Sequence, residues 1–128
     1  MRIMGIDYGE KRVGIAISDE ECKIAFPTTV LQNDKELPKQ VAELCDVNKC
    51  GSVVIGESSD LNGVPNPIAE KIEKFKNNLR TYMKKPIHME PEFFTSIQAE
   101  RIQGKTTMQD ASAAALILQS YLDKTRNM

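Results

Sequence analysis

Five acidic residues stand where predicted strands end or where a predicted helix begins: Asp7, Glu57, Glu90, Glu92 and Asp110. The carboxyl ends of parallel strands meet at one edge of an open α/β sheet, so we expect these side chains to gather there. A cluster of carboxylates in a confined site needs a compensating cation. Mg²⁺ or Mn²⁺ fits best, because hard ions prefer oxygen ligands and keep water molecules for a phosphate substrate. The pattern therefore predicts a metal site that acts on phosphate esters.

Each of these acids also has a structural alternative, which the sequence leaves open. Asp7 could hydrogen-bond the backbone of its own turn, since Asp is common in turns. Asp110 stands three residues after Thr107, and Thr-x-x-Asp resembles a helix capping box. Glu57 and Glu90 have the default role of solvated loop residues. The metal-site hypothesis therefore rests on the convergence of several elements and not on any single position.

Glycines and basic residues surround Asp7 in the stretch GIDYGEKRVGIAISD, residues 5–19. Gly5 and Gly9 suit either a tight turn or the close approach of a phosphate backbone. Lys11 and Arg12 follow in the turn, and we interpret them as partners of a substrate phosphate, with plain exposure to solvent as the alternative. Gly9, Lys11 and Arg12 are thus the predicted nucleic-acid-binding residues.

The elements that must position these residues form a mixed α/β pattern. Three β-rich stretches come first and predict an antiparallel meander, after which helical spacing and apolar runs alternate. The predicted strands are 2–8, 12–18, 24–31, 52–56 and 86–89, and helices are predicted from Asp34 as N-cap, from Asn66-Pro67, over 95–102 and over 108–122. This order predicts a five-stranded mixed sheet, with three antiparallel strands plus two parallel ones and helices on both faces.

Length and composition limit the class of protein. The 128 residues fit one compact domain. A hydrophobic content of 41% and a charged content of 27% are typical of soluble globular proteins. No apolar run approaches the roughly 20 residues of a membrane span, and the start of the chain lacks a signal-peptide pattern. We therefore expect a cytoplasmic protein with no membrane partner.

The cysteines predict free thiols. Cys22, Cys45 and Cys50 are odd in number and have no paired spacing, which fits a reducing compartment. Together with His88 they supply the residue types of a Cys₃His zinc site. The sequence disfavours such a site, because it lacks the close Cys-x-x-Cys spacing typical of one.

Four ordered motifs resemble those of one family over nearly the whole chain. They are GIDYGEKRVGIAISD, then VVIG with DLNG, then FFTSIQAER, and finally KTTMQDASAAALILQSYL. Together they are similar to the YqgF/RuvX-type family, whose members are described as Holliday junction resolvases or as nucleases that mature the precursor of the small-subunit (16S) ribosomal RNA. The resemblance implies an RNase H-like fold and a metal-dependent phosphodiesterase, with residues 1–128 as a single nuclease domain.

The resemblance also implies a set of site residues. The family's site combines an Asp on the first strand, a Glu late in the chain and an Asp that opens the last helix. These positions match Asp7, Glu92 and Asp110, as catalytic residues and metal ligands. Glu57 occupies the strand end where related resolvases carry a catalytic Glu, so it is a candidate fourth ligand. Two Mg²⁺ or Mn²⁺ ions about 4 Å apart would bridge the scissile phosphate.

The partner implied by the resemblance is nucleic acid, either structured RNA or branched DNA. Exonuclease or endonuclease action, and a monomer or a homodimer, stay open. The family's usual D-E-R-x-T-T stretch reads PEFFTS here, so Pro91 replaces an acid and Phe93 a basic residue. The main alternative is therefore a non-catalytic nucleic-acid-binding or interaction protein on the same fold. ATP binding, as in the actin and sugar-kinase group, conflicts with the length, because that group closes two such domains around the nucleotide.

Overall fold

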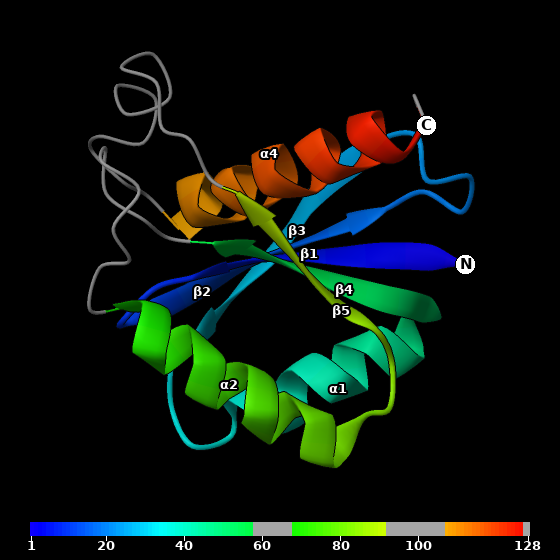
Figure 1. The fold of residues 1–128 in the computed structure, drawn as a ribbon. Coiled ribbons are helices and arrows are strands. Elements are labelled where there is room, and N and C mark those ends of the chain that lie inside the picture. Colours follow the sequence, from blue (N-terminus) through cyan, green and yellow to red (C-terminus); the bar gives the residue numbers. More distant parts are fainter. Residues whose placement is uncertain (58–67, 92–106, 127–128) are drawn as a thin grey trace.

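A computed structural model of the chain describes residues 1–57, 68–91 and 107–126, which are coloured in Figure 1. Its centre is a five-stranded sheet with the strand order β3-β2-β1-β4-β5. The strands are β1 (Arg2–Tyr8), β2 (Arg12–Ser18), β3 (Ala25–Gln32), β4 (Cys50–Glu57) and β5 (Ile87–Pro91). β1, β2 and β3 pair antiparallel, whereas β4 runs parallel to both β1 and β5. The predicted mixed sheet is confirmed.

Helices cover both faces of this sheet (Figure 1). α1 (Leu37–Val47) and α2 (Ile68–Tyr82) pack against one face, and α4 (Thr107–Arg126) packs against the other. Side chains alternate between the two faces along a strand, and the buried residues divide accordingly. The core under α1 and α2 includes Met4, Ile6, Ile15, Val53, Ile55, Val41, Ile72, Phe75 and Leu79, and the core under α4 includes Ala16, Val54, Ala114, Ile117, Leu118 and Leu122. The prediction of helices on both faces is confirmed.

The turn between β1 and β2 is tight and is fixed to the end of β3. A Cβ atom at Gly9 would lie 2.5 Å from the carbonyl oxygen of Arg12, so the turn has no room for a side chain there. Asn33 donates its Nδ2 to the carbonyl of Gly9 at 2.7 Å and its backbone N–H to the carbonyl of Lys11 at 3.0 Å. Turn geometry therefore explains Gly9, whose contact with nucleic acid stays a prediction.

Gly5 serves helix packing. A Cβ atom at this position would lie 2.6 Å from the Cβ of Leu118 and 3.0 Å from the carbonyl oxygen of Ala114. The absence of a side chain lets α4 approach β1 closely. The interpretation of Gly5 as a point of approach for a phosphate backbone is therefore wrong, because α4 occupies that space.

The start of α1 also differs from the prediction. Asp34 is predicted as the N-cap, but Glu36 holds that position and the helix begins at Leu37. Asp34 instead organises the preceding turn: its Oδ1 accepts the N–H of Glu36 at 3.0 Å, and its carbonyl accepts the N–H of Leu37 at 3.1 Å. Pro38 then lies in the first turn, where its missing N–H leaves no helical hydrogen bond unmade.

The predictions for the other helices have different outcomes. The apolar spacing of α2 is confirmed, since Ile72, Phe75 and Leu79 are buried. The predicted helix over 108–122 is confirmed and extends to Arg126. Asn66-Pro67, the DLNG loop and the predicted helix over 95–102 lie outside the described residues. Within the described ranges, no helix combines the length and apolar character that a membrane crossing needs.

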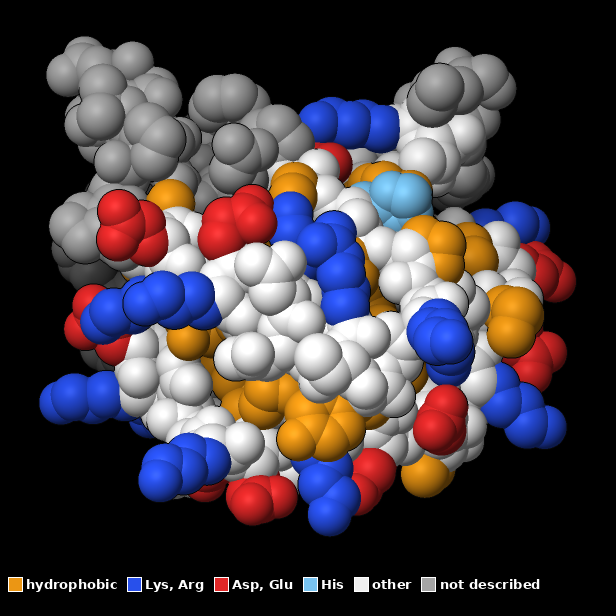
Figure 2. Space-filling view, turned by 60° about the horizontal axis from the view of Figure 1, so that its bottom comes forward, with side chains coloured by type: hydrophobic (Ala, Val, Ile, Leu, Met, Phe, Trp, Pro, Cys, Tyr) orange, Lys and Arg blue, Asp and Glu red, His pale blue; other side chains and the backbone are white. Residues whose placement is uncertain are grey.

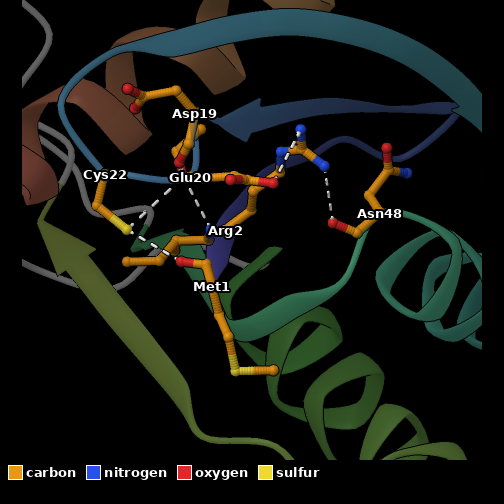
Figure 3. Close-up of polar contacts among 8 residues, drawn as sticks. Met1, Arg2, Asp19, Glu20, Cys22 and Asn48 are labelled. Atoms are coloured by element: carbon orange, nitrogen blue, oxygen red, sulfur yellow. Dashed lines mark hydrogen bonds and ion pairs between the residues drawn. The ribbon is translucent and has the colours of Figure 1, made fainter.

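Polar contacts close the edge of the sheet where β1 begins (Figure 3). The hydroxyl of Ser18 accepts the N–H of Ile3 at 2.9 Å, and the thiol of Cys22 donates to the carbonyl of Met1 at 3.2 Å. The guanidinium of Arg2 donates to the carbonyl of Asn48 at 3.3 Å. These contacts join β1, the β2–β3 turn and the α1–β4 connection at the amino edge, opposite to the edge that carries Asp7.

Candidate functional site

Asp7 lies near the carboxyl end of β1, on the face covered by α4. Gly5, two residues earlier, faces α4 directly, and alternation along the strand gives Asp7 the same orientation. Tyr8, the next residue, packs against the opposite core. Asp7 is half-buried. The last part of β1 thus presents a carboxylate toward α4 and an aromatic ring toward α2.

The first turn of α4 lies at the same edge as Asp7. Ala114 of α4 contacts the position of Gly5 on β1, and α4 begins at the edge where β1 ends (Figure 1). From Ala114, the backbone of Asp110 is one helical turn back, or about 6 Å along the axis. From Gly5, Asp7 is two strand residues onward, or about 7 Å. The two displacements have the same direction, so the structure brings the backbones of Asp7 and Asp110 to one edge.

The carboxyl ends of β4 and β5 reach this edge as well. Glu57 is the last residue of β4, and its backbone pairs with Pro91, the last residue of β5. Glu92 follows Pro91 directly and lies outside the described residues. The predicted convergence of three parallel strand ends and the start of the last helix is confirmed for the elements, whereas the catalytic roles of the side chains stay predictions.

Among the described side chains, which do not include those of Glu57, Glu92 and Asp110, no group of three His, Cys, Asp or Glu is placed to hold a metal ion. All three cysteines are free. A hydrogen bond with Cys50, together with burial, raises the pKa of the Cys45 thiol. Because a thiol must be deprotonated to bind zinc, this environment also opposes a zinc site at Cys45.

Glu90 is not the solvated loop residue that the sequence predicts. It lies within β5 with only 3% of its surface exposed. Its Oε1 is 2.6 Å from Nζ of Lys124 and accepts a hydrogen bond from the hydroxyl of Ser120 at 3.0 Å. Ser120 and Lys124 are four residues apart on α4 and therefore share a helix face. This spacing, together with the apolar residues that alternate with Glu90 along β5, is the signal that could have revealed the contact.

The predicted phosphate-binding residues lie in the β1–β2 turn at the same end of the sheet. Lys11 is exposed and Arg12 is half-buried. Glu10, the residue between Gly9 and Lys11, forms a salt bridge with Lys71 of α2 at 3.3 Å. This salt bridge joins the turn to α2.

Comparisons with known proteins agree with this architecture. The model of the family described as "RuvX: Holliday junction resolvase" matches residues 1–124. A protein of Caldanaerobacter subterraneus subsp. tengcongensis named "Putative pre-16S rRNA nuclease" is 36% identical over 99% of both chains. A protein of Chloroflexus aggregans with the same name is 34% identical over 98% of this chain and 95% of its own.

Solved structures share the fold. RuvC of Thermus thermophilus in complex with a Holliday junction substrate superposes with a TM-score of 0.64 at 14% identity, over 98% of this chain and 96% of RuvC. The fowlpox virus resolvase in complex with Holliday junction DNA gives a TM-score of 0.63 at 14% identity, over 98% of this chain and 99% of the resolvase. These likenesses confirm the predicted RNase H-like fold. Because the family model spans nearly the whole sequence and the relatives match over almost their full length, the chain belongs to the RuvX family.

Proposed function

We propose that this protein is a metal-dependent nuclease that hydrolyses phosphodiester bonds, acts in the cytoplasm and consists of one RNase H-like nuclease domain over residues 1–128. Membership of the RuvX family and the relatives named as nucleases support the nuclease class. The structural observation that carries the proposal is that the end of β1, with Asp7, and the start of α4 lie at one edge of the sheet. Asp110 is in that turn, where the helix dipole favours a carboxylate.

Asp7, Glu92 and Asp110 would hold the metal ions, with Glu57 as a candidate fourth ligand. Carboxylate oxygens are the donors that Mg²⁺ and Mn²⁺ prefer, and the elements that carry Asp7, Glu57 and Asp110 end or begin at one edge. Two divalent ions bound there would polarise the scissile phosphate and favour ionisation of the attacking water. In this proposal Asp7 is the shared ligand, because β1 lies at the centre of the sheet.

Nucleic acid is the proposed substrate, held by Gly9, Lys11 and Arg12 of the β1–β2 turn through a phosphate next to the scissile one. The precursor of 16S ribosomal RNA is the first substrate to consider, since the relatives with 36% and 34% identity are named for it. Branched DNA is the second, favoured by the description of the family. A junction resolvase would need two sites and hence a homodimer, whereas a monomer suffices for RNA trimming.

The decisive experiment measures Mn²⁺-dependent cleavage of a labelled 16S precursor RNA and of a labelled four-way DNA junction. Asp7→Asn should abolish cleavage and leave the melting temperature within a few degrees of the wild type. Asp123→Asn makes the same chemical change near the far end of α4, on an exposed side chain, and should cleave normally. Cleavage by Asp7→Asn at the wild-type rate would exclude this site.

The second candidate function is a non-catalytic nucleic-acid-binding or interaction protein. It is favoured by Pro91 and Phe93, which stand where the family usually has an acidic and a basic residue. This candidate predicts that neither substrate is cut, while salt-sensitive binding is retained and responds neither to Mn²⁺ nor to Asp7→Asn.

A further inference from the structure

A groove with a volume of about 200 Å³ lies beside the carboxyl edge of the sheet, where the proposed active site is, on the face opposite to α4. Three segments that are distant in sequence form it: the end of β1, the β3–α1 connection with the start of α1, and the middle of α2. The lining residues that matter here are Tyr8, Asn33, Lys35, Lys71, Lys74 and Asn78. The family resemblance and the predicted site account for none of the three lysines.

The groove begins directly beside the proposed active site. Tyr8 follows Asp7 in β1, and the two side chains lie on opposite faces of the sheet at its carboxyl edge. The salt bridge between Glu10 and Lys71 holds α2 against the β1–β2 turn. A strand bound at Asp7 could therefore pass over the edge, beside Lys11, and continue into the groove.

The groove is positively charged. Lys35, Lys71 and Lys74 line it, against one acid, Asp34, which already accepts a hydrogen bond from the backbone N–H of Glu36. Lys35 and Lys74 are exposed and form no salt bridge within the described residues. Lysines of this kind are the usual partners of a phosphate backbone. Lys35 and Lys74 therefore make the groove suited to a polyanion.

The groove also has an aromatic floor. The rings of Tyr8 and Phe75 lie with centroids 5.1 Å apart at an angle of 38°. Phe75 is 4% exposed and lies beneath, while Tyr8 is half-buried and is one of the residues that line the groove. Figure 2 shows this face of the molecule, where hydrophobic side chains appear between the Lys and Arg side chains. An aromatic residue that lines a groove among lysines is the arrangement on which the bases of single strands stack.

We propose that this groove binds a single-stranded segment of nucleic acid, with phosphates on Lys35 and Lys74 and a base on the ring of Tyr8. A duplex keeps its bases stacked inside and cannot offer one to Tyr8. The inference deepens the proposed function, on which it rests, because it assigns to the substrate a single-stranded extension next to the bond that is cut.

The test measures binding without cleavage. Fluorescence anisotropy of a labelled single-stranded RNA of about 20 nucleotides is followed between about 50 and 200 mM salt, with a chelator present. The Lys35→Gln/Lys74→Gln variant should make the plot of log K against log salt less steep by about 1.4, since each phosphate contact on a single strand contributes about 0.7. The matched control, Lys49→Gln/Lys84→Gln, removes two charges at the amino edge and should keep the wild-type slope.

A second pair of variants tests the stacking. Tyr8→Leu should weaken binding about tenfold, whereas Tyr8→Phe keeps the ring and should bind like the wild type. The melting temperature of each variant confirms that it is folded. Equal loss of binding in Tyr8→Leu and Tyr8→Phe would contradict the stacking.

Three results would overturn the proposal: an unchanged slope for Lys35→Gln/Lys74→Gln, an equal change for the control pair, or a duplex of the same sequence bound as tightly and through the same lysines. Failure of the proposed function looks different, because the wild type would then cut neither substrate in Mn²⁺. If the wild type cleaves and the slope for Lys35→Gln/Lys74→Gln is unchanged, only the binding role of the groove is excluded, and the nuclease proposal stands.

Discussion

Glu90 illustrates how the protein neutralises a buried carboxylate near the end of a strand. It lies on the face covered by α4, where Lys124 forms a salt bridge with it and the hydroxyl of Ser120 donates to it. A buried carboxylate with a cation at 2.6 Å has no need of a metal ion. These contacts therefore give Glu90 a structural role.

This pairing predicts an asymmetry between two substitutions. Lys124→Met leaves the carboxylate of Glu90, 3% exposed, without its cation and should lower the free energy of unfolding by about 2 kcal/mol. Glu90→Gln removes the charge itself, and its amide can still accept from Ser120, so about 1 kcal/mol or less is expected. Since Lys124 is largely exposed, it returns to solvent at little cost.

Urea unfolding at neutral pH measures both effects. In the double variant Glu90→Gln/Lys124→Met, the total loss should be smaller than the sum of the single losses, because no buried charge is left unpaired. If the losses of the two single variants add up to that of the double variant, or if Lys124→Met is as stable as the wild type, the carboxylate of Glu90 does not depend on Lys124 for its stabilisation.

The contact between α4 and β1 is the feature that positions the site at the scale of elements. Gly5 allows α4 to lie close to the strand, and the same helix carries Asp110 one turn before Ala114. Any side chain at position 5 must push the helix away. The site and the packing of α4 are therefore coupled.

Gly5→Ala should destabilise the protein by about 1–3 kcal/mol, since the added Cβ would lie 2.6 Å from the Cβ of Leu118. Cleavage measured well below the melting temperature should fall as well, because α4 shifts relative to Asp7. Gly51→Ala is the matched control: the atoms nearest its new Cβ belong to the side chain of Met1, which is 80% exposed and free to move. A Gly5→Ala variant with wild-type stability and activity would show that the site does not depend on this packing.

The turn between β2 and β3 predicts a pH dependence of stability. Asp19 accepts the backbone N–H of Ile24 at 3.1 Å and that of Lys23 at 2.7 Å, and these bonds hold its pKa below the ordinary value of 3.8. The ionised form is thus favoured in the folded state. The contribution of the Asp19 carboxylate to folding stability is fully present above the pKa of the unfolded state, near pH 4. It is lost as the pH falls through the lower pKa of the folded state.

Asp19→Asn should therefore melt at a lower temperature than the wild type at neutral pH, and the difference should vanish in strong acid, once Asp19 is protonated. Melting temperatures recorded from about pH 7 to pH 2 test this. A difference that stays constant over the whole range would assign the effect of Asn to packing and not to the charge.

At the scale of the whole molecule, some features could be predicted from the sequence and others could not. The sheet and the helices against it were predictable, because apolar alternation and helical spacing are local signals, and α2 follows them residue by residue. The start of α1 was not, because Asp34 caps a turn before the helix. Ser120, one partner of Glu90, is thirty residues away along the chain, and only the fold brings it and Lys124 to this carboxylate.

The candidate site divides in the same way. The position of Asp7 at a strand end followed from its sequence neighbours, whereas its orientation toward α4 required the packing at Gly5. The lysines of the groove come from two separate segments, and the formal net charge of −1 gives no hint of them. Binding of nucleic acid must then come from local grouping of cations, not from the charge of the whole molecule.

Metal binding at the carboxyl edge should stabilise the whole molecule. An ion that binds only the folded chain, at a hundred times its Kd, adds about 2.7 kcal/mol, which for 128 residues is a rise in melting temperature of about 10 °C. Mn²⁺ should produce such a rise in the wild type and a much smaller one in Asp7→Asn, whereas Asp123→Asn should respond like the wild type. Calorimetric melting with and without Mn²⁺ measures this without any substrate. If Mn²⁺ raised the melting temperature of all three proteins equally, the ions would bind elsewhere, and Asp7 would lose its role as a ligand.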